Sequence, residues 1–271
     1  MKQACVTCCT ILLVSLPVQA GQSCSKLPHS TNMAQAFALA DQVKQWLDKT
    51  DEQVALLARV GQDLSAYGLT YSHAGLIIRE HPSGPWTVVH ELNECNSARS
   101  GIFIQGLANF FADDLYRYDA GIYLLPRDTQ ARLKPLLTNT GATRLHEPAY
   151  NMLAYPFSTK YQNSNGWVIE TLAAALADDP PVQNRHAAQA WLKANDYQPS
   201  RLQISMLKRL GGRATRANIA FDDHPDALRW AGKIDVVSVD SITHFLNRFY
   251  QAKGQRLLEH TLSLSPAIVQ R

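Results

Sequence analysis

The sequence predicts an α+β protein in which a small antiparallel sheet packs on helices, with a helical segment before it and an α/β extension after it. Three observations predict this class. The 271 residues are 46% hydrophobic and 18% charged, which is a globular composition and excludes a disordered or collagen-like chain. Two apolar runs with a short turn between them, within residues 71–92, are typical of a hairpin. A strongly apolar helical pattern follows in residues 161–177.

The first twenty residues have the features of a secretory signal peptide. Lys2 supplies a positive charge, residues 4–16 are apolar, and a small-x-small cleavage site ends at Ala20. The apolar run is shorter than the roughly 20 residues that span a bilayer, so a retained transmembrane anchor is the weaker alternative. The sequence therefore predicts cleavage after Ala20 and a mature chain, residues 21–271, that is periplasmic or secreted.

Cysteine usage changes with that cleavage. Three of the five cysteines lie in the predicted signal peptide, which leaves Cys24 and Cys95. Two cysteines in an exported protein most often form a disulfide, so we expect Cys24 to be bonded to Cys95. Two unpaired thiols are the alternative, because a sequence gives no Cα separation. Both cysteines lie in polar, loop-like surroundings, which does not favour either as a nucleophile.

Residues 32–59 are predicted to form one or two helices. Apolar positions recur there near helical spacing, and a Thr-Asp pair offers a cap for a second segment that runs to Val60. Residues 69–79 and 86–92 then change to β character, and the Pro- and Gly-rich run at 81–85 predicts a turn. We expect these two strands to pair as an antiparallel hairpin.

The rest of the chain alternates between helical and β patterns without an internal repeat. The Pro-Pro pair at 180–181 is the best candidate boundary, but its flanks are too apolar for two independent domains, so one domain over residues 21–271 is predicted. The expected elements are a strand edge running into a short helix (101–115), a strand (120–125), helices (129–137, 161–177, 184–195), a helical stretch (202–210), a strand (217–221), a short helix from Pro225, a strand (234–239) and a helix (240–250).

The charge balance argues against some partners. The chain has 26 basic and 23 acidic side chains, a net charge of +3, and no Lys/Arg cluster stands out. This does not favour a nucleic acid or an anionic membrane as partner. The glycines lack the strand–Gly–Lys–Ser context of a phosphate cradle, and no nucleotide motif is found, so no cofactor is expected.

One polar triplet, Asp222, Asp223 and His224, has residue types that bind metals, with His186 or His244 as conceivable further ligands. The triplet has no second ligand pair at a diagnostic spacing, and no metal site is predicted. A turn, with an aspartate that caps the following helix, is the favoured interpretation.

Three polar patches together suggest covalent catalysis. His73 stands at the start of the first hairpin strand, His90 and Glu91 lie on the second strand, and Ser164 opens the apolar helix. A hydroxyl at a helix N-terminus lies near unpaired backbone N–H groups and the positive end of the helix dipole. An imidazole opposite it can accept its proton, and a second polar side chain can fix the imidazole tautomer.

Each of these residues also has a structural interpretation. Ser164 or Asn163 is of the type that caps helices. His73 taken alone is more often a hydrogen-bonded strand histidine than a general base. His90 and Glu91 alternate across a strand, so one of them is expected to face solvent whatever the function. Only their ordered combination makes the catalytic interpretation as well supported as the structural one.

The order of these residues resembles the circularly permuted branch of the papain-like NlpC superfamily, which includes lecithin:retinol acyltransferase-like enzymes. Those proteins carry a motif similar to Ser/Thr-His-x-Gly-Ile/Leu, then a second histidine, and much later Asn-Cys at the start of a helix. The matching residues here are Ser-His-Ala-Gly-Leu at 72–76, His90, and the pair Asn163 and Ser164. The resemblance implies a papain-like fold of the permuted NlpC type.

More narrowly, the chain resembles the bacterial domain-of-unknown-function family 2145 over most of its mature length. The similar segments are Tyr-Ser-His-Ala-Gly-Leu at 71–76, His-Glu-Leu-Asn at 90–93, Phe-Phe-Ala-Asp-Asp-Leu at 110–115, Tyr-Gln-Asn-Ser-Asn-Gly-Trp at 161–167 and Phe-Asp-Asp-His-Pro at 221–225.

The superfamily resemblance implies a hydrolase or acyltransferase that acts on an amide, ester or thioester. Ser164 would be the nucleophile, His73 the general base and His90 the orienting group, with Glu91 as a substitute for it. The Ser164 hydroxyl would then face the His73 ring at about 2.6–3.2 Å or somewhat longer in a resting state. Peptidoglycan peptides, lipoproteins or another envelope protein are the partners that the superfamily implies.

One departure from the superfamily pattern bears on the activity. Ser164 stands where papain-like enzymes carry cysteine, and a hydroxyl needs a stronger general-base arrangement than a thiol does. Asn163 or Asn165 would help to shape the oxyanion site. A serine enzyme and a non-catalytic envelope binding or accessory module that retains the papain-like groove are therefore both compatible with the sequence.

Overall fold

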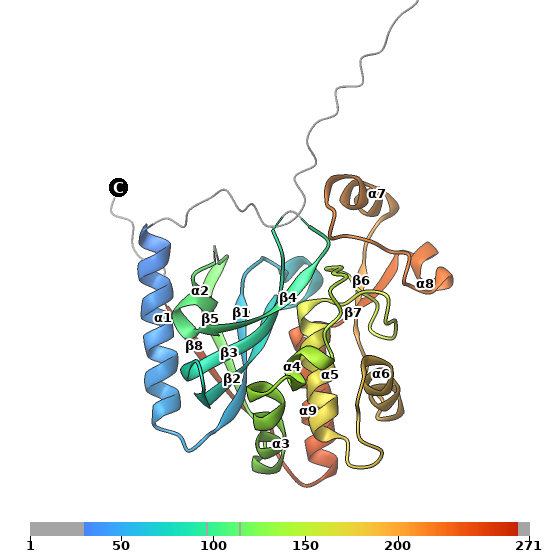
Figure 1. Ribbon diagram of the computed structural model, residues 1–271. Coiled ribbons are helices and arrows are strands. Elements are labelled where there is room, and N and C mark those ends of the chain that lie inside the picture. The colour runs from blue at the N-terminus through green and yellow to red at the C-terminus, as the bar shows by residue number, and fades with distance from the viewer. Residues whose placement is uncertain (1–29, 96, 114, 265–271) are drawn as a thin grey trace, which may run out of the picture.

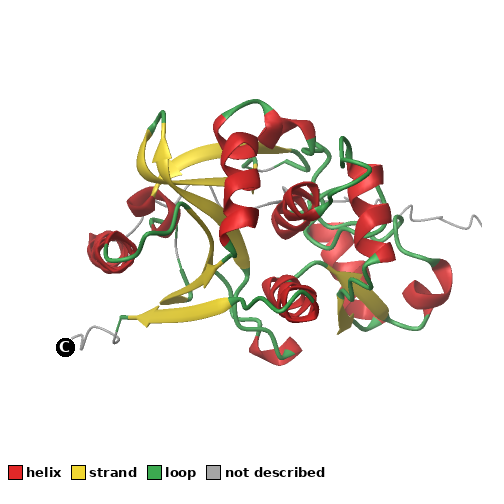
Figure 2. Ribbon diagram, turned by 90° about the horizontal axis from the view of Figure 1, so that it is seen from below, coloured by secondary structure: helices red, strands yellow, loops and turns green. Residues whose placement is uncertain are grey.

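The computed structural model describes residues 30–95, 97–113 and 115–264. They form an α+β fold with a six-stranded antiparallel sheet in the order β4-β3-β2-β1-β5-β8 and helices on both of its faces (Figures 1 and 2). The strands are β1 (Val54–Val60), β2 (His73–His81), β3 (Gly84–Asn93), β4 (Ser100–Gly106), β5 (Arg117–Leu124) and β8 (Leu258–Ser263), with β6 (Ser200–Gln203) and β7 (Lys233–Val236) in a second, two-stranded sheet. The helices are α1 (Ser30–Asp48), α2 (Leu107–Phe111), α3 (Arg127–Thr138), α4 (Gly141–Arg144), α5 (Ser164–Leu176), α6 (Arg185–Ala194), α7 (Met206–Thr215), α8 (Asp226–Trp230) and α9 (Val239–Ala252), besides the 3-10 turn η1 (Ser65–Tyr67).

The predicted hairpin is confirmed, and its register brings two site residues together. β2 and β3 are antiparallel, with Leu76 opposite Val89. Counting back from that pair, His73 near the start of β2 and His90 near the end of β3 come to the same end of the hairpin. The strand and short helix expected within residues 101–115 are β4 and α2.

The second helix expected before Val60 is wrong, because residues 54–60 form the strand β1. All seven residues of this strand are buried, since β1 lies between β2 and β5 and has helices over both faces. A strand buried on both faces shows a continuous apolar run instead of alternation, and such a run is easily mistaken for a buried helix.

The sheet separates two apolar cores. Residues such as Leu56 and Leu76 face α3, α5 and α9 and pack on Trp167. The alternate residues, such as Leu57 and Ile77, face α1 and α2. We call these sides the α5 face and the α1 face. Because side chains alternate along a strand, a residue's position in the register determines which core it meets.

The chain after residue 180 packs on the same body. β8 pairs with β5, and Phe245 of α9 joins the core of the α5 face. The stretch expected to be helical at 202–210 divides into the end of β6 and the start of α7, and β8 was not anticipated. The predicted strand at 217–221 is wrong.

A loop replaces that predicted strand because nearby groups satisfy its backbone. The Asn218 carbonyl accepts from the Met152 N–H, and the Ala220 N–H donates to Asn151 Oδ1. With its donors and acceptors bonded locally, this segment has no need of a strand partner.

The predicted signal peptide and Cys24 lie outside the described residues, so the Cys24–Cys95 bond and the cleavage after Ala20 remain predictions. Among the helices that the structure describes, none is both long and apolar enough to cross a membrane.

Candidate functional site

The N-terminus of α5 is capped by Asn163 and not by Ser164. Asn163 Oδ1 accepts from the Gly166 N–H at 2.7 Å, and Asn163 Nδ2 donates to the Met152 carbonyl at 3.2 Å. Asn163 therefore caps the helix with its oxygen and uses one of its two Nδ2 hydrogens, so its role in an oxyanion site stays a prediction. Ser164 is the first helical residue and is 6% exposed.

Asn165 joins this helix terminus to the hairpin. Its Oδ1 accepts from the Ala74 N–H at 3.1 Å, and its Nδ2 donates to the Ser72 carbonyl at 3.4 Å. The amide of Asn165 thus holds the peptide groups on both sides of His73. One Nδ2 hydrogen is used in this contact and the amide has a second, so its role as an oxyanion donor stays a prediction, while its bonds to the backbone around His73 position the helix against the histidine strand.

The two histidines form a hydrogen-bonded chain with Gln105. His73 Nε2 lies 2.8 Å from His90 Nδ1, and His90 Nε2 lies 3.0 Å from Gln105 Oε1. A carbonyl oxygen only accepts, so His90 Nε2 carries a hydrogen and, in a neutral ring, His90 Nδ1 accepts from His73. His73 Nε2 then carries the hydrogen of the second ring, and none of the described residues donates a hydrogen bond to the lone pair on His73 Nδ1.

Both imidazoles are held in the neutral form. Burial is the main cause of the lowered pKa values, and the positive charge of Arg59 is the next. The pKa of His90 falls to about 3, and that of His73 lies well below its ordinary value. Arg59 is itself buried, lies over the Phe110 ring at 4.8 Å and is paired with Asp113. The chain of imidazoles is therefore in its base form at neutral pH.

The predicted hydrogen bond between Ser164 and His73 is absent from the described part of the structure. The imidazoles of His73 and His90 pack against Phe110 on the α1 face, with ring centroids 5.8 and 5.2 Å from it. The helix that begins at Ser164 packs on the α5 face. Asn165 connects the two groups, but the nucleophile and the base are not in contact.

Ser164 instead interacts with Tyr150, which the sequence analysis missed. Burial is the main cause that raises the pKa of Tyr150 to about 12, the charge of Glu91 acts in the same direction, and the Ser164 hydroxyl and N–H oppose them. The phenol is therefore protonated and able to donate. Tyr150 follows α4 in a loop that bridges to Gln162, and no local sequence signal marks it.

Glu91 lies on the α5 face, whereas His90 projects to the α1 face. The strand partner of Glu91 is Ile102, which packs in the α5-face core. Glu91 therefore cannot replace His90 as the group that orients His73, and this prediction was wrong because adjacent strand residues point to opposite faces. The expectation that one of the two would face solvent also fails, since both are 0% exposed.

The Glu91 carboxyl is buried without a normal hydrogen bond from the described residues to either oxygen. Burial is the main cause that raises its pKa to about 8. The Ser100 hydroxyl, which is engaged with His146 at 3.0 Å, and the charge of Arg185 only partly oppose this shift. Glu91 is therefore largely protonated at neutral pH.

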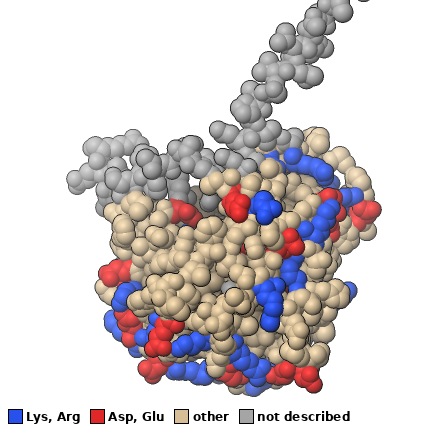
Figure 3. Space-filling view, viewed as in Figure 1, with Lys and Arg blue, Asp and Glu red and all other residues tan. Residues whose placement is uncertain are grey.

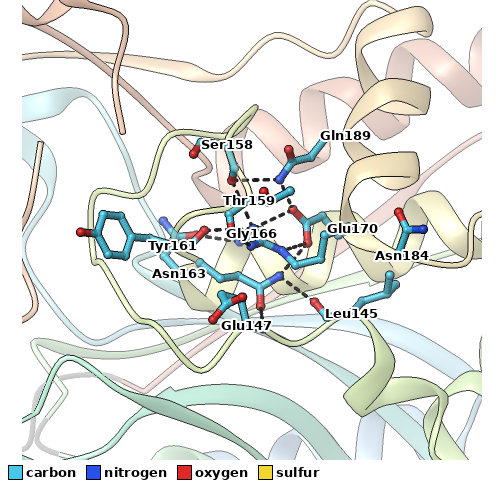
Figure 4. Close-up of polar contacts among 12 residues, drawn as sticks. Leu145, Glu147, Ser158, Thr159, Tyr161, Asn163, Gly166, Glu170, Asn184 and Gln189 are labelled. Carbon is cyan, nitrogen blue, oxygen red and sulfur yellow. Dashed lines mark hydrogen bonds and ion pairs between the residues drawn. The ribbon is translucent and has the colours of Figure 1, made fainter. Parts of the chain in front are cut away.

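A second buried carboxyl, Glu170 of α5, is fully bonded (Figure 4). Arg185 Nε and Nη2 donate to its two oxygens at 2.8 and 3.1 Å. Gln162 and Gln189 donate at 2.7 and 2.8 Å. Arg185 also donates to the Tyr161 carbonyl at 3.0 Å, so the network joins α5, α6 and the loop before α5.

The triplet considered as a metal site is bonded within the protein. Asp222 pairs with Lys160 at 2.7 Å, and Asp223 accepts from the Tyr155 N–H at 2.7 Å. His224 contacts Asp223 and the Asp235 carbonyl, each at 3.0 Å. The residues form the predicted turn, but no aspartate caps α8, whose N-cap is a proline without a side-chain bond. Within the described residues, no three His, Cys, Asp or Glu side chains are grouped as a metal site would require.

The fold and the site thus define an α+β protein with a histidine hairpin tied to a helix N-terminus. A protein-family model described as "Uncharacterized protein conserved in bacteria (DUF2145)" matches residues 46–246. The chain belongs to this family. Neither the search of curated proteins nor the search of solved structures returned a match.

Proposed function

We propose that the protein is an exported cell-envelope hydrolase or acyltransferase of the papain-like kind, in which Ser164 replaces the usual cysteine. The observation that carries this proposal is the His73–His90–Gln105 chain, which keeps His73 Nδ1 unprotonated on the strand whose backbone Asn165 of the helix terminus holds. Relays of this form, which fix the tautomer of a catalytic histidine, recur in acyl-transfer enzymes.

The reaction requires the Ser164 hydroxyl to leave Tyr150 and reach His73 Nδ1. The imidazole would take the hydroxyl proton while the Ser164 oxygen attacks the carbonyl carbon of an amide, ester or thioester. The carbonyl oxygen would receive hydrogen bonds from backbone N–H groups at the start of α5 other than that of Gly166, which is bonded to the Asn163 cap. The proton then passes from His73 to the leaving group, and water or an acyl acceptor releases the acyl group.

Peptidoglycan peptides, lipoprotein acyl chains or another envelope protein are the proposed substrate classes or partners. The site alone does not select among them, because fold-level similarity does not define a substrate. Export is part of this proposal and is tested separately: mass spectrometry of the envelope fraction should find an N-terminus at or within a few residues of Gly21.

A specific observation favours the alternative, a non-catalytic envelope binding or accessory module. Ser164 is 6% exposed and is engaged with Tyr150 instead of a base. In this case Ser164 and His73 would hold the helix and the hairpin together without chemistry.

A fluorophosphonate probe separates the two functions. Labelling of the wild-type protein that is lost in Ser164→Ala and in His73→Ala, but kept in Ser83→Ala, supports the enzyme, because Ser83 is an exposed serine in the hairpin turn. The double variant should lose no more labelling than either single variant, as expected of groups that act as one catalytic unit. If the wild-type protein is not labelled, or if folded Ser164→Ala is still labelled, the enzyme proposal is wrong and the binding module is favoured.

A further inference from the structure

The helix α7 stands out from the body of the protein with its apolar side uncovered. Met206, Leu207 and Leu210 are 61%, 82% and 67% exposed. In Figure 1 the helix lies at the upper right, beyond the small sheet of β6 and β7. The other side of α7 is packed, since Arg209 is 8% exposed with its guanidinium 6.0 Å from the centre of the Phe221 ring.

The helical spacing separates an apolar stripe from two basic margins. At 3.6 residues per turn, the side of α7 that carries Arg209 faces the body, so Leu207 and Leu210 point away from it. Lys208 and Arg213, both exposed, lie on the two borders of the apolar stripe. Such long side chains can lay their methylene stems along an apolar surface while their charges extend beyond it.

The charge around α7 differs from that of the whole chain. The helix itself, Met206–Thr215, contains three basic side chains and no acidic one, although the complete sequence has a net charge of only +3. In Figure 3, Lys and Arg side chains appear at the upper right, with Asp and Glu side chains beside them at the right edge. On the neighbouring helix α8, Asp226 is paired with Arg229 at 2.5 Å, and Trp230 adds a side chain that is 65% exposed.

We propose that α7 binds the surface of an anionic phospholipid bilayer. Leu207 and Leu210 would enter the boundary between headgroups and acyl chains, and Lys208 and Arg213 would meet the lipid phosphates. An amphipathic helix with an apolar stripe between cations fits this position, and an exposed tryptophan is suited to the same interface. A membrane-bound position of this kind does not depend on whether Ser164 is catalytic.

Flotation with lipid vesicles tests this proposal on the protein recovered from its producing cells. We expect binding to vesicles of phosphatidylglycerol and phosphatidylethanolamine and none to vesicles of phosphatidylcholine alone. The double substitution Leu207→Ser and Leu210→Ser should lower the partition coefficient of the protein between vesicles and water by at least about tenfold. Each of Lys208→Gln and Arg213→Gln should weaken binding about fivefold, which corresponds to about 1 kcal/mol per cation, and high salt should do the same to the wild type.

A matched control is Phe37→Ser, which changes an apolar side chain on α1 that is 56% exposed. This variant should bind as the wild type does. The proposal is overturned if the wild type ignores anionic vesicles, if Phe37→Ser loses as much binding as the α7 variant, or if the leucine variant binds normally. It is also overturned if the leucine substitutions instead abolish a dimer in the absence of lipid, since the face would then join two copies of the chain.

Discussion

Two buried glutamates, Glu170 of α5 and Glu91 of β3, have opposite surroundings. Glu170 is 2% exposed and accepts four hydrogen bonds from Arg185, Gln162 and Gln189. Glu91 is 0% exposed and has no normal hydrogen bond from the described residues to either oxygen. Burial raises the pKa of both, but for Glu170 the adjacent guanidinium and amides oppose the rise.

The comparison distinguishes two uses of a buried acid. Glu170 lies where three chain segments meet, and its bonds to them give it a structural role. Glu91 accepts no comparable hydrogen bonds from the described residues. It lies close enough to Tyr150 for its charge to raise the pKa of the phenol. A buried carboxyl without partners costs stability when it ionises, which is typical of functional sites. Four experiments test this difference, in order of decreasing effect.

Arg185→Met should give the largest effect. The substitution leaves Glu170 as a buried acid without its cation, and breaking a buried pair in this way costs about 3–5 kcal/mol. Urea unfolding at pH 7 measures the loss. Adding Glu170→Leu should restore most of the stability, because replacing both partners by apolar groups removes the unpaired charge. A loss below about 1 kcal/mol in the single variant would contradict a structural role.

Glu91→Gln should change how stability depends on pH. The folded pKa of Glu91, about 8, lies above its ordinary value of 4.5, so the stability is fully present below about pH 4.5 and declines up to about pH 8. Between these values the unfolded chain releases a proton that the folded protein retains. The wild type should therefore lose roughly 1 kcal/mol per pH unit relative to Glu91→Gln. If plots of the unfolding free energy against pH are parallel for the two proteins from pH 5 to 8, Glu91 ionises normally and the prediction is wrong.

His90→Gln tests a pKa shift of the opposite sign, which destabilises the folded protein at low pH. The folded pKa of His90, about 3, lies below its ordinary 6.5, so its contribution is fully present above about pH 6.5 and is lost as the pH falls toward 3. The unfolded chain there binds a proton that the folded ring excludes, at roughly 1 kcal/mol per pH unit. The unfolding free energy of the variant should fall less steeply than that of the wild type as the pH is lowered. Some fall remains, because the lowered pKa of His73 acts in the same direction. Acid titration followed by circular dichroism measures this, and an equally steep fall in the variant would contradict it.

The smallest effects concern the N-terminus of α5. Asn163→Ala should cost about 1 kcal/mol, because it removes the side-chain acceptor of the Gly166 N–H. Ser164→Ala should change the unfolding free energy by less than about 0.5 kcal/mol, because Ser164 is not the cap. Thermal unfolding of both variants compares them. The reverse order would mean that Ser164 carries the structural bond at this terminus.

The sequence predicted the parts of the site that depend on local pattern. The hairpin follows from two apolar runs joined by a short turn, so the placement of His73 and His90 on neighbouring strands was foreseeable. The start of α5 near Ser164 was also foreseeable from the change of polarity there. Tyr150 and Gln105 were missed because the first comes from an irregular loop and the second from an edge strand with no distinctive motif.

The errors in the fold have a similar origin. Residues 54–60 lack alternation because both faces of β1 are buried, so their pattern does not distinguish a strand from a helix. β8 is mostly polar and exposed, and it becomes a strand through its pairing with β5. The faces of His90 and Glu91 show the same limit. Alternation predicts that they diverge, but only the assembled helices show that both sides are buried.

The place of β8 determines when folding can finish. Tyr123 donates to Glu259, which lies 136 residues later in the chain, and Trp46 stacks on His260 with centroids 4.2 Å apart. Until the residues of β8 have left the ribosome, or the export channel for a translocated chain, β5 presents an open edge of backbone donors and acceptors. Contacts so distant in sequence also form slowly. The order of synthesis thus keeps the sheet incomplete until β8 has been made, and a chain cut before β8 would keep that edge available to other strands.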